Sequence, residues 1–170
     1  KELEFSETIG PSDSDCRRML DDLGMKAVAG GAAFSKLASS LPDVIRHSHI
    51  LGKEFVACYW PWPDGGENKK LEDCRKVADN FNELGRKLQI EGLRFVFHHH
   101  DIEFLAVDGR IPCDILLEKT DPALVSMELD VFWAGQAGMD PARYLGSNRH
   151  RVALLHLGDR AKTGERKVYC

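Results

Sequence analysis

The chain has 170 residues, of which 27 are acidic and 23 are basic, which gives a formal net charge of −4. Apolar residues make up 43% and charged residues 29%, an ordinary globular composition that excludes long disorder, collagen-like repeats and a disulfide-dense scaffold. The mild acidity argues against a nucleic-acid-binding surface, and no apolar run is long enough to span a bilayer. The length predicts a single domain, residues 1–170, with enough chain to bury a sizeable core.

The five cysteines are scattered along the chain, and none has the spacing of a metal finger or a redox motif. Such a pattern is typical of buried thiols in a reducing compartment, so we predict a cytoplasmic protein. Because the chain starts at Lys1 rather than at Met, an exported precursor is kept as the alternative.

Short apolar segments alternate with longer amphipathic ones, and in chain order they predict the following elements. The first half contains a strand at residues 1–5, a helix from the Ser12 cap to Leu23, a strand at 25–29, a helix at 41–52 and a strand at 55–60. The second half contains a helix at 71–91, a strand at 93–97, a turn at Asp108-Gly109, a helix at 112–119, a strand at 125–133, a helix at 141–145, a strand at 152–157 and a polar tail.

This alternation predicts parallel strands joined by right-handed crossovers. An open doubly wound sheet and a (β/α)8 barrel both satisfy it. No Gly-rich phosphate-binding loop follows the first strand, which weakens the dinucleotide-binding form of the open sheet. Polar residues gather where strands end, which favours the barrel, because the carboxyl ends of barrel strands carry the chemistry. These residues are Trp60, residues 98–100, Glu128, Asp130 and His156.

Three histidines follow the strand at 93–97, with an acid nearby. In an extended chain His98 and His100 share one face and His99 takes the other. Together with Glu103 they form a pattern typical of a metal or acid–base cluster. We therefore predict His98, His100 and Glu103 as catalytic residues; a solvated loop or a structural histidine is the alternative.

Two carboxylates interrupt an apolar strand, since Glu128 and Asp130 lie on one face of the segment 125–133. Burying them without partners would cost several kcal/mol, so they need a cation, an arginine or hydrogen-bond donors. His156 ends the next strand, and neighbouring parallel strands would bring it to the same mouth as Asp130. We predict Asp130, His156 and His98 as metal ligands and Glu128 as a catalytic carboxylate, with ion pairs at the mouth as the alternative.

Aromatic side chains also end two of the strands. Trp60 and Trp62 come at and after the end of the strand at 55–60, and Trp133 ends the segment 125–133. We predict that they bind substrate, because an aromatic ring can stack on the C–H groups of a sugar face. At least one of Trp60 and Trp62 should line the same pocket as the histidines; a hydrophobic lid is the alternative.

Taken together, these segments resemble the sugar phosphate isomerase/epimerase family, the xylose isomerase-like TIM barrels. Residues 97–104 read Phe-His-His-His-Asp-Ile-Glu-Phe, similar to the family's YHNHDFEF signature with Phe for Tyr and His99 for Asn. Residues 108–141 contain, in the family's order, Asp-Gly, Thr-Asp-Pro, Glu-Leu-Asp-Val-Phe-Trp and Gly-Met-Asp-Pro, and residues 156–159 are similar to its His-Leu-Lys-Asp. The likeness covers nearly the whole chain.

The resemblance implies an incomplete (β/α)8 TIM barrel of the xylose isomerase-like type, with strands two to seven present and strands one and eight missing. A full barrel takes about 200 to 250 residues, so the chain is expected to be a fragment, a chain with a gap, or a part completed by another chain. Six parallel strands would leave two unpaired edges. On that expectation the chain alone would be unstable or would associate, and a homo-oligomer is left open.

The resemblance also implies a divalent metal cofactor, Mn, Co, Mg or Zn, held by a Glu, an Asp, a His and a second Glu. Asp130 and His156 match the middle pair. Neither Glu has a counterpart, so His98 or Glu103 would replace the first, and Gly158 stands where the family has Lys.

The implied activity is isomerisation or epimerisation of a keto-sugar, a sugar phosphate or a cyclitol through an enediolate. The partner would be a small-molecule sugar, with no nucleic acid or membrane. The same enolate could instead expel a leaving group, giving a dehydratase or lyase that acts on an oxidised, 3-keto sugar. A carbohydrate-binding relative without catalysis is the third interpretation, which Gly158 and the unmatched Glu favour.

Overall fold

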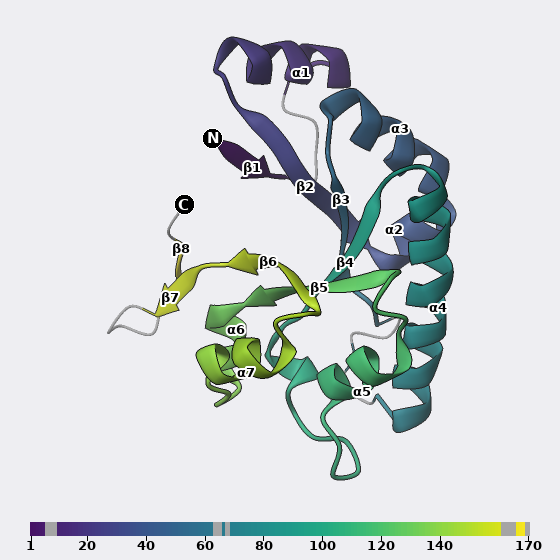
Figure 1. Ribbon diagram of the computed structural model, residues 1–170, viewed down its shortest axis with the longest axis vertical. Coiled ribbons are helices and arrows are strands. Elements are labelled where there is room, and N and C mark those ends of the chain that lie inside the picture. Colours follow the sequence, from purple (N-terminus) through teal and green to yellow (C-terminus); the bar gives the residue numbers. More distant parts are fainter. Residues whose placement is uncertain (6–9, 63–65, 67–68, 161–165, 169–170) are drawn as a thin grey trace.

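The structure is a computed structural model that describes residues 1–5, 10–62, 66, 69–160 and 166–168. Six parallel strands form one sheet in the order β1-β2-β3-β4-β5-β6, as predicted. These strands are β1 (Glu2–Glu4), β2 (Lys26–Ala33), β3 (Phe55–Trp60), β4 (Arg94–His98), β5 (Val125–Asp130) and β6 (Val152–His156). The sheet curls into a half-barrel whose helices cover the outer side, and β1 and β6 form its two edges (Figure 1).

The helices alternate with the strands along the chain. They are α1 (Asp13–Asp22), α2 (Phe34–Ser39), α3 (Leu41–Leu51), α4 (Leu71–Ile90), α5 (Pro112–Lys119), α6 (Val131–Gln136) and α7 (Pro141–Asn148), with a 3-10 turn η1 at Asp101–Glu103. Local signals explain several of their ends: the Ser12 hydroxyl accepts a hydrogen bond from the backbone of Asp15 at 3.1 Å, and Gly52 ends α3 with φ of 71°. Within the described chain, no helix combines the length and apolar character needed to cross a membrane.

The main core lies between the outer face of the sheet and the long helix α4. The apolar stripe of α4 places Phe81 against two strand residues, with ring centroids 5.0 Å from Phe95 and 5.6 Å from Phe97. The inner face carries a smaller cluster that includes Ala29, Phe55, Ala57 and Val96. Burial on both faces is the reason why these strands read as continuous apolar runs.

Three expectations about the elements were wrong in detail. The expected strand at 125–133 ends at Asp130, because the Asp130 carboxylate accepts hydrogen bonds from the next backbone N–H groups and starts α6. The strand expected at 25–29 continues to Ala33, and the short helix α2 follows it. The expected polar tail contains an antiparallel pair, β7 (Gly158–Arg160) and β8 (Arg166–Val168).

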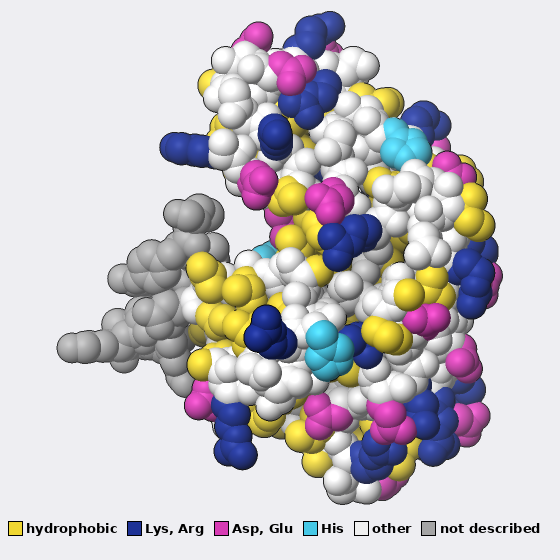
Figure 2. All heavy atoms as spheres, viewed as in Figure 1, with side chains coloured by type: hydrophobic (Ala, Val, Ile, Leu, Met, Phe, Trp, Pro, Cys, Tyr) yellow, Lys and Arg dark blue, Asp and Glu magenta, His cyan; other side chains and the backbone are white. Residues whose placement is uncertain are grey.

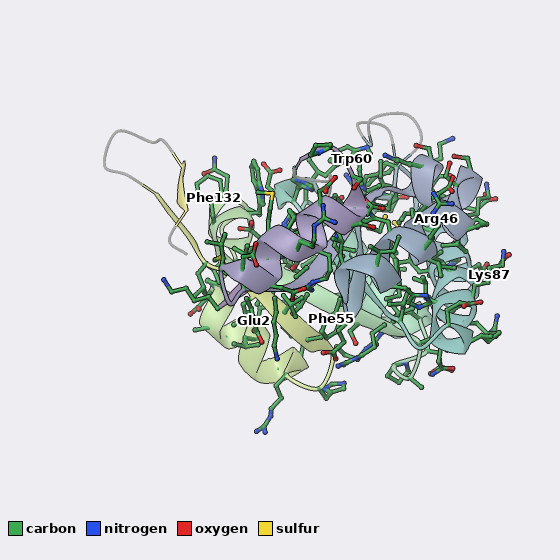
Figure 3. The ribbon with its side chains drawn as sticks, turned by 90° about the horizontal axis from the view of Figure 1, so that it is seen from above. Glu2, Arg46, Phe55, Trp60, Lys87 and Phe132 are labelled. Carbon is green, nitrogen blue, oxygen red and sulfur yellow. The ribbon has the colours of Figure 1, made fainter. Side chains whose placement is uncertain are left out.

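The carboxyl ends of the strands share one rim of the half-barrel. In Figure 3, Trp60, which ends β3, and Phe132, which follows β5, lie at the upper rim. Glu2 and Phe55, the first residues of β1 and β3, lie below them. The space-filling view shows a deep notch between the part that carries α1 and the part that carries β6 (Figure 2). A functional site is therefore expected on the inner face of the sheet at the upper rim.

A buried arginine joins the lower ends of α5, β5 and β6. The Arg151 guanidinium is 6% exposed and donates hydrogen bonds to the carbonyl of Leu117, to Thr120 Oγ1 at 2.7 Å and to the carbonyl of Val125 at 3.2 Å. Arg151→Met should lower the free energy of unfolding by about 2–4 kcal/mol, because it leaves these buried acceptors unpaired. Urea unfolding checks this. The exposed neighbour Arg149, changed to Met, is the control, and equal stability of the two variants would contradict the assignment.

Candidate metal centre at the carboxyl ends of the strands

Side chains from four strands meet on the inner side of the upper rim. His98 ends β4 and pairs in register with Glu128 of β5, and Asp130 pairs in register with His156 of β6. Glu4, at the end of β1, completes the group. The parallel register thus places these residues in two successive layers at the carboxyl ends of the strands, whereas the sequence could only assign them to successive strands.

The first group of ligand-type atoms comes from His98, Asp130 and His156. Asp130 Oδ2 lies 3.4 Å from His98 Nε2 and 3.6 Å from His156 Nδ1, and one ligand atom from each residue lies within 4.8 Å of the others. Metal–ligand bonds of about 2.0–2.2 Å put neighbouring ligand atoms roughly 3–3.6 Å apart. The spacing of these three atoms is therefore close to that of a coordination site.

The second group shares His156 and adds two glutamates. His156 Nε2 lies 2.7 Å from Glu4 Oε2 and 3.3 Å from Glu128 Oε1. The hydroxyl of Tyr59 donates a hydrogen bond to Glu4 Oε1 at 2.7 Å. Because Glu4 and His156 stand on opposite edge strands, this contact exists only through the curl of the sheet.

The electrostatics of this cluster reflect an excess of buried carboxylates. Burial, with the neighbouring charge of Glu4, raises the pKa of Glu128 to about 8. Burial opposes ionisation of Glu4, but its hydrogen bonds with His156 and Tyr59 hold its pKa at about 2. Burial also opposes protonation of His156, yet hydrogen bonds with Asp130 and Glu4 raise its pKa to about 10. A positive charge is thus strongly favoured among these carboxylates.

Buried polar atoms without partners show that the residues fit a divalent cation. Both carboxylate oxygens of Glu128 and Nδ1 of His98 are buried and have no hydrogen-bond partner among the described residues. Leaving such atoms unpaired costs about 1–3 kcal/mol each, more for a charged group. A cation among the carboxylates would offset that cost, and a mixed set of imidazole and carboxylate ligands suits Zn, Mn or Co.

The orientation of Asp130 is fixed by the helix that it starts. Its Oδ1 accepts hydrogen bonds from the backbone of Phe132 at 2.9 Å and of Trp133 at 3.0 Å. This arrangement leaves Oδ2 facing the two histidines. Capping α6 therefore also aims the carboxylate.

His99, which follows β4, positions the backbone of Asp130 at the end of the neighbouring strand β5. Its Nε2 accepts a hydrogen bond from the backbone N–H of Asp130 at 3.0 Å, and its Nδ1 donates to the carbonyl of His100 at 3.0 Å. Burial lowers the pKa of His99 to about 4, so the ring stays neutral and keeps this tautomer. The sequence placed His99 on the opposite face from His98, but nothing in it indicated this contact.

His99→Leu should weaken the site by removing that acceptor. The buried N–H of Asp130 would lose its partner, at a cost of about 1–3 kcal/mol in unfolding free energy. Metal affinity should fall about 10- to 100-fold, the usual effect of losing a residue that orients a ligand. His99→Asn, which restores the residue of the family signature and can still accept a hydrogen bond, should lose less. Competition with a metal-sensitive dye measures the affinities, and an unchanged affinity in the Leu variant would contradict this role.

Glu103, predicted as a catalytic residue, does not reach this cluster. It is buried, and its Oε1 accepts a hydrogen bond from the indole of Trp62 while its Oε2 accepts one from the backbone of His100 at 2.6 Å. Both carboxylate oxygens are therefore engaged, one by Trp62 and one by the backbone at the start of η1. Trp62, predicted to bind substrate, is 4% exposed and packs in the main core, and its role in binding substrate stays a prediction.

Trp60 and Trp133 lie next to the histidines, as expected. The ring of His100 is 5.2 Å from that of Trp60, 5.3 Å from that of Trp133 and 4.9 Å from that of His98, centroid to centroid. Of the first two tryptophans, Trp60 is the one whose ring contacts a histidine, His100, and a shared pocket stays a prediction. A role of these rings in binding substrate stays a prediction.

Two members of the cluster, Glu4 and Tyr59, were not identified from the sequence. The sequence pattern could have identified Glu4, because this carboxylate lies between the apolar residues Leu3 and Phe5 near the end of a strand. Glu128 has the same pattern of apolar neighbours. Tyr59 gave no such signal, because an aromatic residue in a buried strand is ordinary.

Comparison with known proteins shows which proteins this chain resembles in sequence. No family model matches the chain. An inosose dehydratase of Bacillus anthracis (strain CDC 684 / NRRL 3495) is 34% identical over 88 residues, which are 52% of this chain and 29% of that protein. The match thus spans less than a third of the length of this curated relative.

Solved structures match over most of the chain. A sugar phosphate isomerase/epimerase from Parabacteroides distasonis ATCC 8503 superposes with a TM-score of 0.83 at 23% identity, covering 94% of this chain and 65% of that one. The IOLI protein with a binding zinc atom superposes with a TM-score of 0.71 at 14% identity, covering 89% and 58%. The incomplete TIM barrel of the xylose isomerase-like type, expected from the motifs, is therefore the fold of this chain, and its structural neighbours include sugar phosphate isomerases/epimerases.

Proposed function

We propose that the protein is a divalent-metal-dependent enzyme that moves a proton next to the carbonyl of a keto-sugar or cyclitol, as an isomerase or epimerase. The observation that carries this proposal is the spacing of His98, Asp130 and His156, with the buried carboxylate of Glu128, which accepts no hydrogen bond from the described residues, 3.3 Å from His156. A metal that polarises a carbonyl and a carboxylate that moves a proton are the two groups that enolisation needs.

Some residues of the site would bind the cation, and others would transfer the proton or contact the substrate. His98, Asp130 and His156 would hold the cation, which when bound supplies Lewis-acid polarisation of the substrate oxygens. Glu128 has the position of the acid–base group, because its oxygens lie in the cluster but accept no hydrogen bond from the described residues. Glu4, held by Tyr59, keeps His156 oriented through Nε2. His100, Trp60 and Trp133 would form the wall of the sugar site.

A dehydratase is the second candidate, favoured by the similarity to inosose dehydratases. The first step would be the same, removal of the proton next to the carbonyl by a carboxylate. The carbon–oxygen bond at the next carbon would then break, and the hydroxyl would leave as water with a proton from the same or another acid. The two activities therefore share the site and differ in the fate of the enolate.

Exchange of the proton in D₂O tests the proposal before the product is known. The purified protein is incubated with keto-sugars, their phosphates and a ketocyclitol, each with Mn, Co, Mg or Zn or with EDTA. Metal-dependent deuterium incorporation next to the carbonyl supports the proposal. A rearranged or epimeric product then identifies an isomerase or epimerase, and loss of water identifies a dehydratase.

Two results would count against the proposal. One is tight sugar binding with no exchange under any metal, which would favour the carbohydrate-binding interpretation. The other is exchange that EDTA does not reduce, which would exclude the metal from the step.

A further inference from the structure

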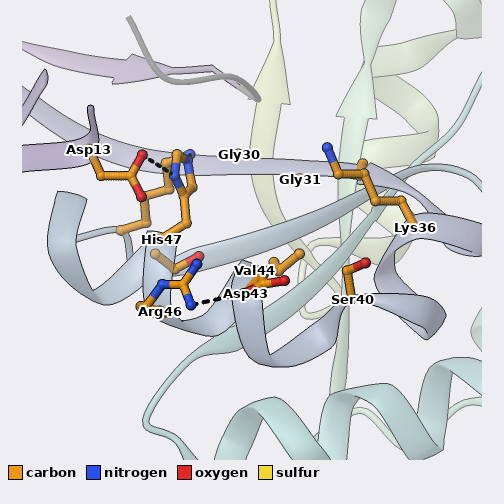
Figure 4. A pocket seen from close by; sticks show the side chains of 12 residues that line it. Asp13, Gly30, Gly31, Lys36, Ser40, Asp43, Val44, Arg46 and His47 are labelled. Carbon is orange, nitrogen blue, oxygen red and sulfur yellow. Dashed lines mark hydrogen bonds and ion pairs between the residues drawn. The ribbon is translucent and has the colours of Figure 1, made fainter. Parts of the chain in front are cut away.

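A second polar pocket lies on the opposite, helix-covered side of the sheet. It has a volume of about 430 Å³ and is bounded by β2, α2 and α3, with Asp13 at the start of α1 (Figure 4). Gly30, Gly31 and Ala32 of β2 are among the residues that line it. Its volume is within the range of small-molecule sites, and none of its lining residues belongs to the metal centre.

A buried lysine reaches this pocket from the lower end of β3. Lys53 is 5% exposed, and its Nζ donates a hydrogen bond to the carbonyl of Phe5 at 2.8 Å and lies 3.1 Å from His47 Nε2. His47 Nδ1 in turn lies 2.9 Å from Asp13 Oδ1, so the ring donates to Asp13 and accepts from Lys53. No carboxylate among the described residues is within ion-pair distance of Lys53, and its burial lowers its pKa to about 8.

The backbone leaves room for this ammonium group. A Cβ at Gly30 would lie 2.4 Å from Lys53 Nζ and 2.0 Å from the carbonyl oxygen of Phe5. Any other residue at position 30 would displace the lysine or the β1 end. The glycine therefore leaves the space that the Lys53 ammonium group occupies beside the end of β1.

The charges around the pocket do not cancel. Arg46 is paired with Asp43 at 2.9 Å, and Asp13 is occupied by His47 (Figure 4). Lys36, which lines the pocket from α2, makes no ion pair with any described residue, like Lys53. A buried cation without a counterion is costly, and an anionic group in the pocket would offset that cost.

We propose that this pocket binds a small molecule through a phosphate or carboxylate group, with Lys53 and Lys36 as the cationic contacts. Lysine serves such oxyanions as a point charge, and Ser40 on the pocket wall offers a hydroxyl. The competing explanation is that Lys53 has a structural role only, linking the end of β1 to α3 through its hydrogen bonds with the Phe5 carbonyl and with His47. The two explanations differ in whether an added anion finds the pocket.

Amide NMR spectra during titration with inorganic phosphate and, separately, acetate test the proposal, with EDTA present and sodium chloride holding the ionic strength constant. Shifts should concentrate at Gly30, Gly31 and Val44, with a dissociation constant of about 1 mM or tighter for the favoured anion. The response of each anion shows whether phosphate or carboxylate is preferred. Absence of saturable shifts, or shifts spread over the surface, would overturn the proposal.

Matched variants locate the binding. Lys36→Gln, an exposed change, should weaken binding about threefold or more, and Lys53→Met should abolish it. Lys87→Gln on α4 should leave it unchanged. If Lys53→Met does not fold, the comparison of Lys36→Gln with Lys87→Gln still decides, since equal affinities in those two would refute the site. Failure here would leave metal content and proton exchange unaffected, so it is distinguishable from failure of the proposed function.

Discussion

Asp130→Asn should reduce metal binding and turnover together while leaving the fold intact. The Asn Oδ1 can still accept the hydrogen bonds from Phe132 and Trp133 that start α6. The amide group would replace Oδ2 opposite His98 and His156, so the negative charge at the cation site is lost. We expect metal affinity to fall about 100-fold or more, with turnover falling at least in proportion.

Asp140→Asn is a matched control for this change. Asp140 caps α7 in the same way, accepting hydrogen bonds from Ala142 at 3.0 Å and Arg143 at 3.1 Å, but it is exposed and belongs to neither ligand group. Metal content by mass spectrometry, turnover and thermal unfolding are measured for both variants. Full metal and activity in Asp130→Asn would refute the ligand assignment, and equal losses in the two variants would show that capping alone is responsible.

Glu128→Gln should lower turnover about 10²–10⁴-fold, the usual contribution of a general acid or base. The substitution keeps the size of the side chain and removes its negative charge and its capacity to take up or release a proton. Metal affinity should change much less than in Asp130→Asn, because the first ligand group does not include Glu128.

The split between binding and turnover tests the assignment of Glu128. Deuterium exchange next to the carbonyl should fall with turnover, while metal content stays near that of the unchanged protein. If Glu128→Gln loses metal as completely as Asp130→Asn does, Glu128 is a ligand and not the acid–base group. If exchange continues at the original rate, another residue moves the proton.

Local signals in the sequence were enough to predict most of the fold. Short apolar runs predicted β3, β4 and β6, and the periodic stripe from Leu71 predicted α4, because burial against the sheet requires those spacings. The alternation of strands and helices then required a parallel sheet. The end of β5 was predicted too late, because Asp130 reads as a strand residue until its carboxylate is seen to cap α6.

The sequence by itself also determined the centre of the candidate site. Asp130 and His156 end successive parallel strands, and the register of such strands places their side chains next to each other. The tertiary structure alone decided the contacts that depend on curvature and packing. Glu4 reaches His156 because the sheet curls until its two edge strands face each other, His99, which follows β4, accepts a hydrogen bond from the backbone of Asp130 on the neighbouring β5, and Glu103 turns away to pair with Trp62. These contacts join positions far apart in the chain, and no local propensity encodes the distance between them.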